Sequence, residues 1–394
     1  MTTPDNHYSI FRNIGKGGIA LLILGALLFM AGGILKLSSQ TMLQSYLYAW
    51  VFMMMFTIGC YGFMLMYYMT RAAWGKPTIR ILEAGARLLP VMLALFLPVM
   101  IWHGLIYPWA NPELVRTDEI LHNRSIWMNS SFWIFRTVAY FALWSGFTYY
   151  LTDLSRKQDA SKDFRLETRR QKTSVAGFLL LVITLTLAST DWVMSLDKHW
   201  FSTMFGFLFV DFSGLAAIGF VTLIVTSQKI AKKEPYNTLV TKVETRDLGN
   251  LLLMLTMIWA YFSLSQWLII WSGNLPEETE FYLIRNKDAF LFVGAFNIVF
   301  SFFVPFVCLI SGRTKRTPHL LMYVSAGLLL MRLIDSFWIV MPTMRYPGLV
   351  ISDVGAVCIL LGAWLFFHSA VIQQAPLIPN HETTVGAQEE LVNV

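Results

Sequence analysis

Apolar residues gather along this chain in ten blocks, each about 20 residues long and interrupted only by isolated polar side chains. A helix of roughly 20 apolar residues spans the hydrocarbon core of a bilayer, so the pattern predicts an all-α integral membrane protein with ten transmembrane helices. The composition agrees, because only 14% of the residues are charged, whereas soluble domains have about 25%. The predicted helices are centred near Leu27, Thr57, Phe96, Phe141, Ile183, Gly214, Met257, Phe300, Leu329 and Leu361.

Lysine and arginine favour one face of the predicted bundle. Of the 30 such residues, 21 fall in the N-terminal segment and the even-numbered connections, seven fall in the odd-numbered connections, and two lie inside helices. Because basic connections stay in the cytoplasm, this bias predicts that both termini are cytoplasmic. The net charge of +6 thus reflects topology and gives no reason to expect nucleic-acid binding. The predicted parts are a cytoplasmic N-terminus (1–16), a ten-helix transmembrane domain (17–373) and a cytoplasmic C-terminal tail (374–394).

Ionisable side chains occur inside the predicted helices, mostly in their outer halves. Such groups are costly in hydrocarbon and usually face the interior of a helix bundle. Arg332 and Asp335 are three residues apart, so we expect a salt bridge on one helix face, and we expect Arg136 to meet an aspartate across helices, either Asp191 or Asp211. The set is either a paired structural network or a water-filled vestibule, open to the outer side, that carries protons or receives a polar head group. Its members are His103, Arg136, Asp191, Asp211, Arg332, Asp335 and Asp353.

Histidines and cysteines give no sign of a haem or metal site. A transmembrane b-type haem needs two axial ligands on facing helices at one depth, but His103 is predicted near the outer surface and His368 near the inner one. The three cysteines lie singly inside apolar blocks, and the chain has no C-x-x-C pair. The sequence patterns of P-loop and G-x-S-x-G enzymes are absent too. We therefore expect no cofactor, no metal and no catalytic residue in this chain.

Four stretches carry a family resemblance. The most specific is DWVMSLDKHWFSTMFG, from Asp191 to Gly206. The others are LHNRSIWMNSSFWIFRTVAYFALW from Leu121 to Trp144, SQWLIIWSGNLPEE from Ser265 to Glu278, and the pair FVPFVCLISGRTKR and MRLIDSFWIVMP between Phe303 and Pro342. Together they resemble the ActF family, membrane subunits of bacterial alternative complex III that are related to the NrfD/PsrC-like anchors. The resemblance runs from the second to the tenth predicted helix.

This resemblance implies two four-helix bundles, made of helices 2–5 and 6–9 and flanked by helices 1 and 10, in the inner (plasma) membrane of a bacterium. The implied partners are a paralogous quinol-binding membrane subunit, a periplasmic iron–sulfur protein, multihaem and monohaem cytochromes c, and lipids. Menaquinol, haem c and iron–sulfur clusters would be bound by those partners. The chain departs from the family at Ser301, where a histidine is frequent, and at Lys198, where proline is common. The first departure weakens a proton relay through the eighth helix.

Sequence and resemblance together predict a non-catalytic membrane subunit of a respiratory quinol:electron-acceptor oxidoreductase of the cytochrome c type. It would act as a scaffold and as a proton half-channel open to the periplasm. One alternative is a second quinone-binding subunit, since phenylalanine and methionine are abundant at the helix interfaces. Another is a secondary transporter, which would favour interrupted helices in matching halves. Pro90, Pro98 and Pro305 lie inside helices but do not form such a matched pair.

Overall fold

The computed structural model describes residues 8–161, 163–345 and 349–379 of this 394-residue chain. Within these ranges every regular element is helical. Nine helical segments of the described residues are long and apolar enough to cross a membrane, which indicates a multi-pass membrane protein. They comprise α1 (Ser9–Ile34), α2 (Ser39–Thr70), α3 (Ile79–Ala86) with α4 (Leu89–Ile101), α8 (Phe164–Trp192), α9 (Phe205–Ile230), α11 (Lys242–Gly273), α13 (Asp288–Ile298) with η6 (Val299–Phe303) and α14 (Val304–Ile310), α16 (Pro318–Met344) and α17 (Ile351–Ile372).

The predicted block around Phe141 forms α7 (Ser130–Ser161), which is not among the nine segments. Its 32 residues equal those of α2, and it packs along α8. At ~1.5 Å per residue it is long enough for a bilayer core of ~30 Å. Its hydropathy is lower because Arg136 and several tyrosine and tryptophan residues interrupt the aliphatic ones. The predicted count of ten therefore remains a prediction.

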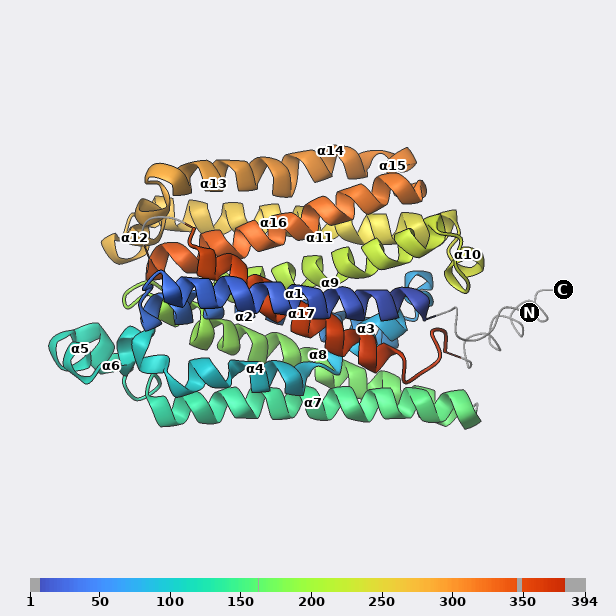
Figure 1. Ribbon diagram of the computed structural model, residues 1–394, viewed down its shortest axis with the longest axis horizontal. Coiled ribbons are helices and arrows are strands. Elements are labelled where there is room, and N and C mark those ends of the chain that lie inside the picture. The colour runs from blue at the N-terminus through green and yellow to red at the C-terminus, as the bar shows by residue number, and fades with distance from the viewer. Residues whose placement is uncertain (1–7, 162, 346–348, 380–394) are drawn as a thin grey trace.

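The connecting elements gather at the two ends of the helix bundle. One end, at the left of Figure 1, carries α5 (Pro112–Thr117), α6 (Glu119–Arg124) and α12 (Pro276–Arg285). The other end carries α10 (Tyr236–Leu239) and α15 (Gly312–Arg316). These two ends correspond to the predicted outer and inner sides, and we call them the outer end and the inner end.

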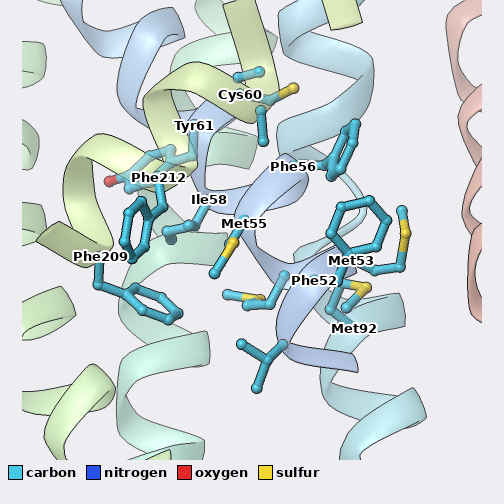
Figure 2. Packing of buried hydrophobic residues seen from close by; sticks show 14 of the residues in the cluster. Phe52, Met53, Met55, Phe56, Ile58, Cys60, Tyr61, Met92, Phe209 and Phe212 are labelled. Atoms are coloured by element: carbon cyan, nitrogen blue, oxygen red, sulfur yellow. The ribbon is translucent and has the colours of Figure 1, made fainter. Parts of the chain in front are cut away.

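Two helices, α2 and α9, form the centre of the molecule, and most of their residues are buried. They approach so closely that a Cβ atom on Gly59 of α2 would lie 1.9 Å from the carbonyl oxygen of Ser213 of α9. Helices α4 and α8 pack on α2, with α7 beyond them, and α11 and α16 pack on α9. Figure 2 shows Phe209 and Phe212 of α9 on one side of α2 and Met92 of α4 on the other.

The first and last described helices, α1 and α17, pack along each other through glycines spaced seven residues apart. A Cβ atom on Gly25 would lie 2.7 Å from the carbonyl oxygen of Gly355, and one on Gly18 would lie 2.7 Å from that of Gly362. Small residues allow this backbone contact, which stabilises helix pairs in a membrane where apolar side chains gain little by association. The α1–α17 pair joins the centre mainly through the contacts of α17 with α2.

Candidate functional site

The first buried charge pair joins α7 to α8. Arg136 donates to Asp191 through both Nε, at 2.8 Å to Oδ2, and Nη2, at 2.7 Å to Oδ1. Tyr140 donates its hydroxyl to Oδ2 at 3.0 Å, and Trp127 donates its indole N–H to Oδ1 at 3.3 Å. We call these four residues the first network. It holds one positive and one negative charge, and every carboxylate oxygen of Asp191 accepts at least one hydrogen bond.

The second buried charge pair lies on α16. Arg332 Nη1 donates to Asp335 Oδ2 at 2.7 Å, as the spacing of three residues predicted. The same oxygen accepts the indole N–H of Trp259 from α11 at 3.0 Å. The other oxygen accepts the side-chain amide of Asn297 from α13 at 2.5 Å. The pair therefore ties three helices of the second half together.

Ser301 extends this pair into η6, a π-helical turn. Its hydroxyl accepts from Arg332 Nη2 at 2.9 Å and donates to Asn297 Oδ1 at 2.6 Å. Pro305 lies four residues later and has no N–H for the carbonyl of Ser301, which favours the irregular turn. Such turns often occur at functional sites. Arg332, Asp335, Trp259, Asn297 and Ser301 form the second network, and the serine that departs from the family pattern is one of its members.

Asp211 on α9 lies beside the second network. Its side chain is 4% exposed, and neither carboxylate oxygen has a hydrogen-bond partner among the described residues. It interacts electrostatically with both Arg332 and Asp335. Arg332 Nε also lacks a partner in the described part of the chain. One arginine thus faces two buried carboxyl groups, and only one of these is hydrogen-bonded.

The other two predicted residues lie in local contacts of their own. His103 is hydrogen-bonded at 2.8 Å to both the carbonyl of Met100 and the hydroxyl of Ser130. Asp353 accepts two hydrogen bonds from Arg345, at 2.8 and 2.6 Å, and one from Ser45 at 2.6 Å. Across residues 8–161, 163–345 and 349–379, no hydrogen bond or ion pair joins the first network, the second network, His103 or Asp353 to one another. The seven residues therefore do not form one continuous network there, and whether any of them carries protons stays a prediction.

A buried charged cluster lies at the inner end, where the sequence predicted only His368. Arg80 and Glu83, each less than 5% exposed, form an ion pair at 2.6 Å. Glu83 also accepts hydrogen bonds from the hydroxyl groups of Tyr68, at 2.5 Å, and Ser155, at 3.1 Å, while Arg80 pairs with Asp159 of α7. Arg80 was counted among the residues of a connection, but α3 begins at Ile79 and carries both Arg80 and Glu83 into the bundle. Their spacing of three residues, equal to that of Arg332 and Asp335, was the available signal.

Outer connections bind each other next to the first network. Asp118 accepts two backbone N–H groups from the first turn of α6 and the Nε2 of His199, at 2.9 Å. The hydrogen bond with His199 is the main reason why the pKa of Asp118 is lowered. Arg124 donates to the backbone carbonyls of Lys198 and His199, at 3.0 and 3.3 Å. The segment with the most specific family resemblance is thus held to α6.

A cavity of about 550 Å³ adjoins the second network. It lies between α9, α11, α12, α13, η6 and α16, and Asp335 and Asn297 form part of its wall. Most of the remaining wall is apolar or aromatic, including Phe212, Trp259 and Trp338. A cavity of this size is in the range of small-ligand sites.

Helices of this length and hydropathy, with charge pairs buried between them, define a multi-pass helical membrane protein. No family model matches the chain, and no curated protein is significantly similar to it. The resemblance to the ActF family therefore rests on the four sequence segments.

Proposed function

We propose that this chain is a non-catalytic membrane subunit of a respiratory quinol oxidoreductase of the alternative complex III type. The four family segments support the proposal. In it, α7 is the tenth span, both termini are cytoplasmic, and helices 2–5 and 6–9 form two four-helix bundles. The packing of α4 and α8 on α2, and of α11 and α16 on α9, supports this division. Menaquinol, haem c and iron–sulfur clusters belong to the partner subunits.

We further propose that Asp211, together with the second network beside it, carries protons in the outer half of the membrane. The lack of a hydrogen-bond partner for Asp211 among the described residues is the observation that supports this role. A buried carboxylate is costly unless it is paired and hydrogen-bonded. Arg332 already pairs with Asp335, so a proton on Asp211 is the simplest way to balance the charges of this site. A proton that is exchanged between Asp211 and the outer aqueous phase would make the site a half-channel that ends near the middle of the bilayer.

Complex membership is tested by purification in mild detergent from the native membrane. We expect the chain to co-purify with subunits that show haem c absorption and iron–sulfur signals. A stable, monodisperse protein that contains neither would contradict the proposed complex.

The proton role is tested in proteoliposomes that contain the whole complex. Asp211→Asn should leave subunit composition and quinol oxidation by an uncoupled sample unchanged but lower the number of protons translocated per electron. The matched control is Asp153→Asn, which alters a carboxylate with a 56% exposed side chain at the inner end of α7. An unchanged proton-to-electron ratio in Asp211→Asn would contradict the proposed role.

A further inference from the structure

The cavity beside the second network has a gradient of polarity along the membrane normal. Its outer end is lined by Gln266, Tyr282, Arg285 and Asn286, which lie on α11 and α12 or just after them. Its inner end reaches Phe302 and Phe303, which lie about 20 Å below the start of α13 at ~1.5 Å per residue. The cavity is therefore polar at its outer end and apolar at its inner end, and between them its wall includes Asn297 and Asp335, whose side chains are hydrogen-bonded within the second network.

The outer end offers hydrogen-bond donors that the described residues do not use. Trp338 Nε1 is buried and has no acceptor among them. Tyr282 receives a hydrogen bond from Gln266 at 3.3 Å, which leaves its own hydroxyl hydrogen for a ligand. Donors of this kind select a ligand with acceptor oxygens near the outer surface, such as carbonyl or phosphate oxygens.

Arg285 adds an uncompensated positive charge to the same end. Its side chain is fully buried and donates to the backbone carbonyls of Phe281 at 2.8 Å, Trp338 at 3.0 Å and Ile339 at 2.5 Å. Burial lowers the pKa of Arg285 to about 9, so the group remains cationic at neutral pH. Asp197 acts on it only from beyond ion-pair distance. An anionic group at the outer end would complement this charge.

The side of the cavity opens toward the lipid. Leu264, Trp267, Leu291 and Phe303 line it, and each of these side chains is at least 40% exposed on the apolar belt of the protein. A ligand would therefore arrive from the membrane. The polar groups Asn297 and Asp335 of the cavity's inner part bond to each other and to Ser301 and Trp259. Ser263 is the remaining polar side chain of that wall, and the other residues are apolar or aromatic, which suits a hydrocarbon chain.

We propose that this cavity binds one acyl chain of a phospholipid from the outer leaflet, with the ester and phosphate oxygens at Tyr282, Trp338 and Arg285. The polarity gradient of the cavity follows that of a lipid in this leaflet. A ring compound with oxygens at opposite edges would place its inner oxygen below Tyr282 and Trp338, where the wall is mostly apolar or aromatic, which disfavours it. The site is independent of the proposed proton role, since it uses the outer wall of the cavity and requires no titration of Asp211.

Native mass spectrometry of the protein purified in mild detergent tests this proposal. We expect one phospholipid to be retained per chain. Ala260→Phe places a ring in the cavity and should lower lipid retention at least tenfold, whereas Met257→Phe, on the 43% exposed face of α11, should not change it. Tyr282→Phe and Trp338→Phe should each weaken retention severalfold. Equal retention by Ala260→Phe and Met257→Phe, or retention of a quinone in place of a phospholipid, would overturn the proposal.

Fluorescence quenching tests the same proposal without a cavity-filling variant. Trp259 is only 5% exposed, so bulk lipid cannot reach it, but it lines the cavity. Phospholipids with brominated acyl chains should quench the part of the tryptophan emission that is lost in Trp259→Phe. Trp364, which is 1% exposed and does not line this cavity, serves as the control and should not be quenched. Unquenched Trp259 emission would contradict occupancy by an acyl chain.

Discussion

The first and second networks each bury an arginine–aspartate pair, but they differ in how their charges balance. In the first network, Asp191 is the one carboxylate that Arg136 binds, and Tyr140 and Trp127 donate to the remaining lone pairs of that carboxylate. In the second network, Arg332 serves Asp335, while Asp211 lies beside the pair without a hydrogen bond from any described residue. The first network thus contains one arginine and one carboxylate. Beside the second network lies an additional carboxyl group, that of Asp211.

This difference separates two roles that the sequence could not distinguish. The first network is a balanced pair that joins α7 to α8, and both carboxylate oxygens of Asp191 accept hydrogen bonds. Asp211 can accept or release a proton while Arg332 keeps its ion pair with Asp335. We therefore propose a structural role for the first network and a functional one for the second network with Asp211, and variants of Asp191 and Asp335 can test this division.

The largest effect is expected when the first network loses its only carboxylate. Asp191→Ala strands Arg136 in a buried position, and a buried pair broken in this way costs about 3–5 kcal/mol. The free energy of unfolding can be measured by detergent titration at fixed lipid content. Asp153→Ala, which breaks a half-exposed pair with Arg87, is the control and should cost less than about 1 kcal/mol. A loss of similar size in both variants would remove the structural role of the first network.

A smaller effect is expected at the matching position of the second network. In Asp335→Ala, Asp211 can turn its carboxylate toward Arg332, so we expect a loss of about 2 kcal/mol, below the usual cost of a broken buried pair. Adding Asp211→Asn to Asp335→Ala should then raise the loss in the free energy of unfolding to the usual value of about 3–5 kcal/mol, because no carboxylate remains near Arg332. Additive losses in the double variant would show that Asp211 does not compensate, and the comparison would fail.

The smallest effect concerns the outer connections beside the first network. The folded state holds the pKa of Asp118 below its ordinary value of 3.8, mainly through His199, so this contact stabilises the folded loops above that value. The stabilisation is lost as the pH falls through the lower folded-state pKa. Acid should therefore increase amide hydrogen exchange in α6 before that in α12, and Asp118→Asn should remove the difference. Equal acid sensitivity of both connections in the unmodified protein would contradict this.

The membrane-spanning segments could be predicted because the hydropathy of a helix depends only on the residues of that helix. Nine of the predicted blocks became candidate spans, and α7 was left out because Arg136 and its aromatic neighbours lower its hydropathy. Contacts within one helix could also be predicted, as for Arg332 and Asp335. Contacts between helices could not, since nothing along the chain decides whether Arg136 meets Asp191 or Asp211.

Two features of the site depend on packing alone. Arg80 and Glu83 belong to the bundle because α3 begins at Ile79, one residue before Arg80, and a hydropathy profile cannot fix a helix start so closely. The isolation of Asp211 depends on which partners the neighbouring helices supply. The role of Ser301 likewise follows from the π-helical turn, which presents its hydroxyl to Arg332 and Asn297.

The central claim is that Asp211 holds the proton that balances the second network, and infrared spectroscopy tests it most directly. In protein with isotope-labelled aspartate, a protonated carboxyl group gives a carbonyl stretching band that shifts with the label. We predict that this band is present in the unmodified protein at neutral pH, persists in Asp153→Asn, and disappears in Asp211→Asn. Absence of the band from the unmodified protein, or its persistence in Asp211→Asn, would contradict the account.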